Sequence, residues 1–201
     1  QTVTLPGGDA FTTALALGDV DGDGHLDIVV GNDYNDPNQL LINKGNGTFD
    51  EPVNLPGDSP GCEAGGDCLD TRALALGDVD GDGHLDLILG NFDQPNLLLL
   101  NNGSGYFTQT VTLPGTLPGG DAYTTALAVG DVDGDGLLDI VVGNNDDPNQ
   151  LLINKGNGTF EAPVNLPGDS PGCGEGVFRS LPDPYVQRTR HPPCARATRL
   201  P

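Results

Sequence analysis

The chain has 201 residues, of which 29 are acidic and only 8 are Lys or Arg, so its formal net charge is −21. This charge argues against nucleic acids and anionic membranes as partners, because like charges repel. No apolar run is long enough to span a membrane. The 31 glycines and 17 prolines predict many turns and short strands rather than long helices.

Short apolar runs between turn residues predict four strands in the first part of the chain, near Thr12–Leu17, Ile28–Val30, Gln39–Asn43 and Phe49–Leu55. The first run alternates small Ala with large Leu, which is typical of a strand packed on both faces. The Asn-Gly pair at residues 46–47 lies between apolar runs and predicts a hairpin turn. The same features recur downstream, so we expect the same four strands in each later unit.

A nine-residue acidic loop separates the first two of these strands and occurs three times, at residues 19–27, 78–86 and 131–139. Four carboxylates in nine residues repel one another unless a cation lies among them. Oxygen ligands at positions 1, 3, 5 and 9, with a backbone carbonyl at position 7, suit calcium, and glycine at position 6 permits the sharp turn. A metal-free Asp/Gly turn is the alternative, which three intact copies disfavour.

We therefore predict three calcium ions, about one per repeat. The predicted ligands are the carboxylates of Asp19, Asp21, Asp23, Asp27, Asp78, Asp80, Asp82, Asp86, Asp131, Asp133, Asp135 and Asp139 and the backbone oxygens of His25, His84 and Leu137. An EF-hand is disfavoured because it needs flanking helices and a Glu at position 12. Here position 12 is Val30, Leu89 or Val142, and each loop leads into a strand.

The spacing of the loops, 59 and then 53 residues, predicts a repeat architecture. We divide the chain into repeat 1 (1–57), repeat 2 (58–115), repeat 3 (116–173) and an irregular Arg/Pro-rich tail (174–201). Residues 38–49 recur unchanged as 149–160. Residues 1–7 reproduce 109–115, so we expect the sequence to begin inside a unit, at its last strand.

Two cysteines, Cys62 and Cys68, bracket a short Gly-rich segment and predict a local disulfide, which would fit an oxidising compartment. Two free thiols remain the alternative. Cys173 occupies the place equivalent to Cys62 without its neighbour, and Cys194 is a possible substitute partner.

The motif Gly-Asp-Val-Asp-Gly-Asp-Gly-x-x-Asp, the following Gly-Asn and the closing Asn-x-Gly-x-Gly-x-Phe resemble the FG-GAP/VCBS repeats of integrin α-subunit propellers and of bacterial surface proteins. The resemblance covers about residues 1–173. It implies an all-β fold of three four-stranded, propeller-blade-like repeats with calcium in each Asp-rich loop. It also implies that three repeats are too few for a closed single-chain propeller, since the family usually closes about seven blades.

No nucleophile–base set, phosphate-binding loop or zinc spacing is present, which favours a protein that is not an enzyme. We expect a secreted or cell-surface calcium-binding repeat protein for adhesion or surface assembly. Its expected partners are other copies of itself or the remaining blades of a larger propeller, and protein or glycan ligands. Two alternatives stay open: calcium-stabilised filaments built by stacking repeats between chains, and a fragment of a larger propeller-bearing secreted enzyme.

Overall fold

The computed structural model of the protein describes residues 5–6, 10–33, 36–57, 68–115, 123–145 and 147–167. These residues form three four-stranded antiparallel sheets and no helix, which confirms the all-β prediction. The described part therefore has no helix that could cross a membrane. The tail at 174–201, together with Cys62, Cys173 and Cys194, lies outside the described residues.

The first sheet, unit 1, forms a simple meander in which each strand pairs with the next along the chain. Its strands are β1 (Thr12–Gly18), β2 (Asp27–Asn32), β3 (Gln39–Leu41) and β4 (Val53–Asn54). All four were predicted, but β4 is shorter than expected, and Phe49 joins the sheet through one isolated bridge to Asn43. Pro52 explains the shortening, because proline has no N–H to donate to the neighbouring strand.

The second and third sheets, units 2 and 3, repeat this topology. Unit 2 contains β5 (Thr71–Gly77), β6 (Asp86–Asn91), β7 (Leu97–Asn101) and β8 (Phe107–Thr112), and unit 3 contains β9 (Tyr123–Gly130), β10 (Asp139–Asn145), β11 (Gln150–Leu152) and β12 (Val164–Asn165). Strand β8 is longer than β4 and β12 because Thr110 stands where the other units have Pro52 and Pro163.

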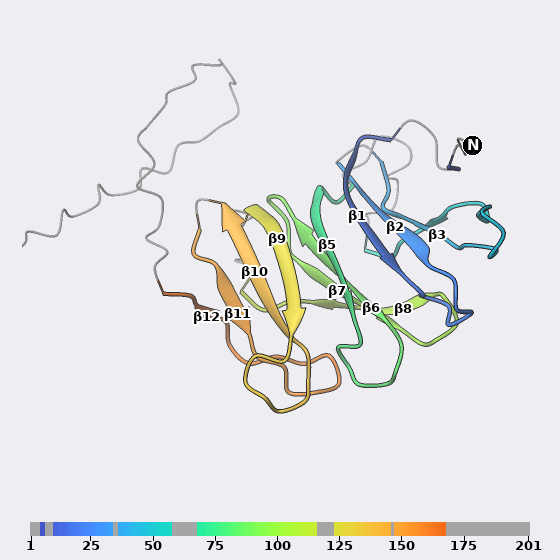
Figure 1. The fold of residues 1–201 in the computed structure, drawn as a ribbon. Helices are drawn as coiled ribbons and strands as arrows, with labels where there is room; N and C mark the ends of the chain where they lie inside the picture. The colour runs from blue at the N-terminus through green and yellow to red at the C-terminus, as the bar shows by residue number, and fades with distance from the viewer. Residues whose placement is uncertain are drawn as a thin grey trace, which may run out of the picture.

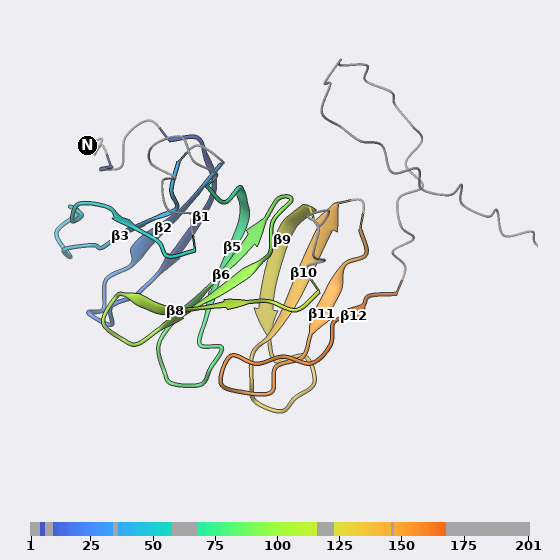
Figure 2. The same cartoon turned by 180° about the vertical axis from the view of Figure 1, so that it is seen from behind.

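The three sheets lie side by side as a fan, with unit 2 in the middle (Figures 1 and 2). Their first strands are neighbours, since β5 contacts both β1 and β9. The loops that follow β1, β5 and β9 therefore lie at the same end of the fan, at the bottom of Figure 1. This arrangement is that of adjacent propeller blades, and it places the three acidic loops in a row.

Each sheet buries its faces against its neighbours. We call the face directed at the next unit the trailing face and the opposite one the leading face. In unit 1 the trailing face consists of Ala16, Val20, Val29, Leu40 and Ile42, which pack on the leading face of unit 2, formed by Leu74, Leu76, Leu87, Leu89 and Leu99. The trailing face of unit 2 packs in the same way on Leu127, Val129, Ile140, Val142 and Leu152 of unit 3. The core therefore lies between the sheets.

Glycine permits the close approach of the sheets. A Cβ on Gly18 would lie 2.7 Å from Cδ1 of Leu76 and 2.8 Å from Cδ1 of Leu85, both in the next unit. The equivalent Gly77 faces Leu138 and Val129 of unit 3 in the same manner. Glycine at the end of the first strand is thus required by packing, as expected where two backbones approach.

Candidate metal centres

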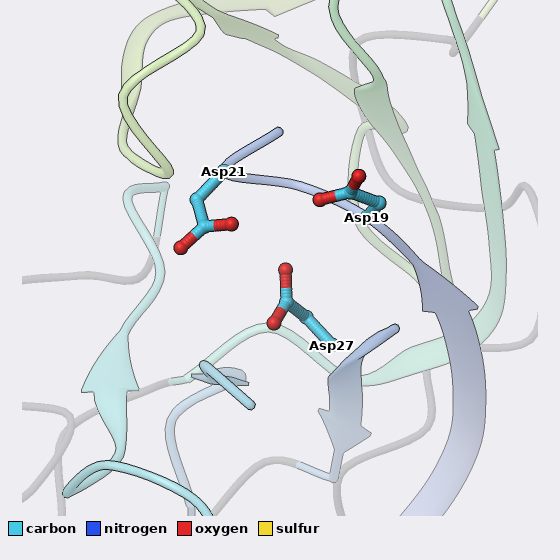
Figure 3. Close-up of side chains that lie close together, drawn as sticks. All are labelled: Asp19, Asp21 and Asp27. Carbon is cyan, nitrogen blue, oxygen red and sulfur yellow. The ribbon is translucent and has the colours of Figure 1, made fainter. Parts of the chain in front are cut away.

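Each acidic loop begins at the end of the first strand of its unit and ends at the start of the second. In unit 1, Asp19 follows β1, Asp21 lies in the loop and Asp27 opens β2, and the three carboxylates point toward one another (Figure 3). One ligand oxygen from each lies within 4.8 Å of the others. The same grouping recurs in units 2 and 3, with Asp78, Asp80 and Asp86 and with Asp131, Asp133 and Asp139.

The loop backbone folds around the first carboxylate of each group. In unit 2, Asp78 accepts hydrogen bonds from the N–H groups of Gly81 (2.8 Å) and Gly83 (3.0 Å). Both glycines have positive φ, 81° and 93°, a region that side-chain-bearing residues avoid. The same geometry appears in unit 3, so the predicted role of the position-6 glycine as the turn residue is confirmed.

The last carboxylate of each group also has a structural role. Asp86 is fully buried, and its Oδ2 accepts hydrogen bonds from the N–H groups of Val79 (2.9 Å) and Asp80 (3.2 Å). Its Oδ1 accepts a third from Asn101 (2.9 Å) at the end of β7. The carboxylate thus joins the loop to the third strand. Burial raises the pKa of both Asp27 and Asp86, because a buried carboxylate loses the hydration of its charged form.

The carboxylates at loop position 5, those of Asp23, Asp82 and Asp135, lie outside the three groups. Each instead accepts a hydrogen bond from the N–H of position 7, at 2.8, 2.9 and 2.8 Å respectively. Their role as ligands, and that of the position-7 carbonyl oxygens, stays a prediction. The position-7 side chains of His25 and His84 lie over glycines of the following hairpin, Gly45 and Gly103.

The donor set fits a hard divalent cation. Oδ1 of Asp19 is buried and has no hydrogen-bond partner. The carboxylate of Asp19 lies close to those of Asp21 and Asp27. A buried oxygen without a partner is costly unless a cation or a donor compensates it. In unit 2, burial and the neighbouring charges of Asp82 and Asp78 raise the pKa of Asp80. All the grouped atoms are carboxylate oxygens, which calcium prefers.

Sequence reasoning missed one group of residues beside the sites: the asparagines at or just after the end of the third strand, Asn43, Asn101 and Asn154. The side-chain Nδ2 of Asn101 donates to the carbonyl of Val20 at 2.7 Å, and that of Asn154 donates to the carbonyl of Val79 at 2.7 Å. These carbonyls belong to position 2 of the acidic loop in the preceding unit. The recurrence of the asparagine in all three units was the available signal.

The geometry of three repeated sheets and loops agrees with the sequence comparisons. A sequence model of the FG-GAP-like repeat matches residues 19–89, 78–142 and 131–178. The chain belongs to the FG-GAP-like repeat family. The family resemblance inferred from the motifs is thereby confirmed.

Relatives of this FG-GAP-like repeat protein include cartilage acidic protein 1 of Xenopus tropicalis, 31% identical over 133 residues, or 65% of this chain and 19% of that protein. Among solved structures, an Agrocybe aegerita lectin described as recognising non-reducing terminal N-acetylglucosamine has a TM-score of 0.54 and 28% identity, covering 76% of this chain and 38% of that one. The Photorhabdus luminescens Tc holotoxin pore matches with 27% identity and a TM-score of 0.43, over 70% of this chain and 6% of that one. The chain thus spans well under half the length of these relatives.

Proposed function

We propose that this chain is a non-enzymatic, extracellular calcium-binding repeat protein that acts in adhesion or surface assembly. The observation that carries the proposal is the threefold recurrence of a carboxylate group at the same place in each sheet, with an uncompensated buried oxygen on Asp19. If one ion stabilises each unit, the same carboxylate group must occur in every sheet, and it does.

Bound calcium would supply positive charge and an oxygen-coordinating centre. Asp19, Asp21 and Asp27, and their counterparts in the other units, would hold it. Ordering the loop also fixes the carbonyl of Val20, which receives the cross-unit hydrogen bond from Asn101. The ion in one unit would therefore strengthen the contact with the next unit.

An extracellular location is supported by two features. Cys68 is disulfide-bonded, and disulfides persist mainly in oxidising compartments; its pairing with Cys62 stays a prediction. The likeness to cartilage acidic protein 1 agrees with this location.

Calorimetric titration with calcium tests the proposal directly. We expect three ions per chain and a higher melting temperature in calcium than in excess EDTA. Asp133→Asn should remove one ion, whereas Asp50→Asn, an exposed residue paired with Lys44 at 2.5 Å outside the acidic loops, should remove none. No heat of calcium binding together with an unchanged melting curve in EDTA would contradict the proposal.

For the adhesive role we propose a glycan as the ligand class. The support is the fold likeness to a lectin that recognises terminal N-acetylglucosamine, which extends over 76% of this chain. Binding of the calcium-loaded chain to a glycan array, with the EDTA-treated chain as control, tests this part. Absence of binding to any glycan of the array, including those with terminal N-acetylglucosamine, would reject the glycan ligand and leave calcium binding unaffected.

A further inference from the structure

The two outer faces of the fan are apolar and exposed within the described part of the chain. On the leading face of unit 1, Leu15 and Leu17 are each 63% exposed. On the trailing face of unit 3, Val132 is 55% exposed, whereas its counterpart Val79 in unit 2 is 0% exposed. In unit 2, Leu74 and Leu76 pack against unit 1 and Val79 packs against unit 3. Each outer face therefore matches one side of the contact that the described sheets already make twice.

We infer that a second copy of this chain covers these faces, with the trailing face of unit 3 in one copy packed on the leading face of unit 1 in the other. The trailing faces of units 1 and 3 carry the same side chains. The corresponding pairs are Ala16 and Ala128, Val20 and Val132, Val29 and Val141, Leu40 and Leu151, and Ile42 and Ile153. The first member of each pair already packs on a leading face, that of unit 2.

The leading face of unit 1 likewise carries the same side chains as the leading face of unit 3. Its Leu15, Ile28, Val30 and Leu41 correspond to Leu127, Ile140, Val142 and Leu152 of unit 3, which already pack on the trailing face of unit 2. A hollow on the leading face of unit 1 is lined by Leu15, Val30 and Leu41, among others. Between units 1 and 2, Val29 and Leu40 fill the equivalent place, so Val141 and Leu151 of the second copy have the size and shape to fill this one.

A hydrogen bond completes the match. Nδ2 of Asn101 donates both to the carbonyl of Leu85 (3.1 Å) and to that of Val20 in the preceding unit (2.7 Å). Nδ2 of Asn43 donates to the carbonyl of Leu26 (2.9 Å), and its second hydrogen is directed by the same geometry toward a preceding unit. In the contact between copies it would donate to the carbonyl of Val132.

This hydrogen bond makes the contact between copies depend on calcium. That dependence rests on the proposed function, in which the loop of unit 3 binds the ion. Val132 lies between Asp131 and Asp133, two of the grouped carboxylates of unit 3. A cation in that loop fixes the acceptor carbonyl and reduces the repulsion between two acidic chains. Without the ion, both the acceptor and the charge balance are lost.

One segment of the chain competes with the second copy. Leu5 and Pro6 border the hollow, next to Ala10 and Gln39. Their counterparts in sequence, Leu55 and Pro56, directly follow β4 of unit 1, where Leu55 belongs to the core between units 1 and 2. In the contact between copies, the matching residues of unit 3 take this place, so Leu5 moves aside. Leu5 is exposed and apolar like Leu15 but is not part of the contact.

The contact joins unlike faces, and such head-to-tail contacts close into rings when the rotation permits. The described parts of two copies bring six sheets together, which is within the range of about 4–8 blades found in propellers. We therefore expect a closed pair of chains in calcium, held by two equal contacts.

Sedimentation equilibrium of the full chain in calcium tests the inference. The wild type should have the mass of two copies at about 100 μM, and Leu15→Asp and Ala128→Asp should each weaken association at least about tenfold, because each buries a charge in the contact. An equimolar mixture of the two variants should restore a 1:1 complex, since each retains the face that the other lacks. This complex should be weaker than the wild-type pair because it has one contact rather than two.

The outcomes distinguish the specific head-to-tail contact from non-specific hydrophobic association, and its failure from the failure of the proposed function. Leu5→Asp should not weaken association, and Leu17→Asp should reproduce the effect of Leu15→Asp if that variant folds poorly. A wild type that binds three calcium ions yet stays monomeric overturns the inference and leaves calcium binding intact. A mixture of variants that remains monomeric overturns it as well. Association that persists unchanged in EDTA overturns the calcium dependence but retains the head-to-tail contact. A titration that detects no bound calcium rejects the proposed function.

Discussion

A leucine at the same position of all three sheets allows the inter-sheet core to be tested within one molecule. Leu40, Leu98 and Leu151 occupy the middle of the trailing face in units 1, 2 and 3. Leu40 is 1% exposed and Leu98 is 0% exposed, whereas Leu151 is half-buried. The three residues are chemically equivalent and differ only in whether a further sheet packs on them.

Replacing each by alanine should therefore have unequal effects. Truncating a fully buried leucine costs about 2–5 kcal/mol, from lost burial and the cavity left behind. We expect about 3 kcal/mol for Leu40→Ala and for Leu98→Ala. Leu151→Ala should cost only about 1 kcal/mol, because water already reaches part of that side chain. At about 2–4 °C per kcal/mol, the melting temperature should fall by about 6–12 °C for the first two and about 2–4 °C for the third.

Thermal and urea denaturation in calcium, at protein concentrations low enough to keep the chains single, measure these differences. Raising the concentration until two copies pair should increase the cost of Leu151→Ala toward that of Leu98→Ala, because the second copy buries Leu151. The reasoning is refuted if Leu151→Ala is as costly as Leu98→Ala at the lowest concentration, since that would mean that the single chain already covers this face.

Three further substitutions or conditions test other features of the structure. Asp86→Ala removes the acceptor of three backbone N–H groups and should cost about 3 kcal/mol in a urea titration in EDTA, whereas Asp82→Ala removes one exposed acceptor and should cost under about 1 kcal/mol there. Gly18→Ala should lower the free energy of unfolding by about 1–3 kcal/mol through overpacking. Gly130→Ala places no atom within 4 Å of the new Cβ and should be neutral or slightly stabilising in dilute protein. Equal melting temperatures for these two variants would contradict the packing argument. Burial raises the pKa of Asp80 and Asp86 in the folded protein, so the associated stability is present at low pH and lost as pH rises through the folded-state pKa. Melting curves in EDTA should therefore show stability that falls as pH rises above the ordinary aspartate pKa of 3.8, and the calcium-loaded protein should show the opposite trend because protons compete for the carboxylates.

The sequence was sufficient to predict the strands and the loops because their signals are local. Alternating apolar residues mark the strands, and glycine marks the turns; Gly83 has the positive φ expected of position 6. The shortness of β4 was predictable in principle, since Pro52 lies within the predicted strand and has no N–H to donate. The grouping of Asp19, Asp21 and Asp27 followed from spacing within nine residues.

Contacts between units could not be predicted in the same way. Asn101 and the carbonyl of Val20 are 81 residues apart, and no local pattern indicates that they meet. The burial of Asp86 depends likewise on strands of its own and neighbouring units rather than on its loop. The position-5 carboxylates show a further limit, because the sequence does not indicate that the Asp82 carboxylate accepts a backbone hydrogen bond and lies outside the group formed by Asp78, Asp80 and Asp86.

Because glycine, leucine and asparagine at each junction belong to every unit, the junction itself is inherited whenever a unit is copied. A gene duplication that adds one sheet adds a matching pair of surfaces and an acidic loop at the same time. The unchanged recurrence of residues 38–49 as 149–160 fits such an origin. Arrays of this kind can lengthen or shorten during evolution by whole sheets without the need to select a new interface.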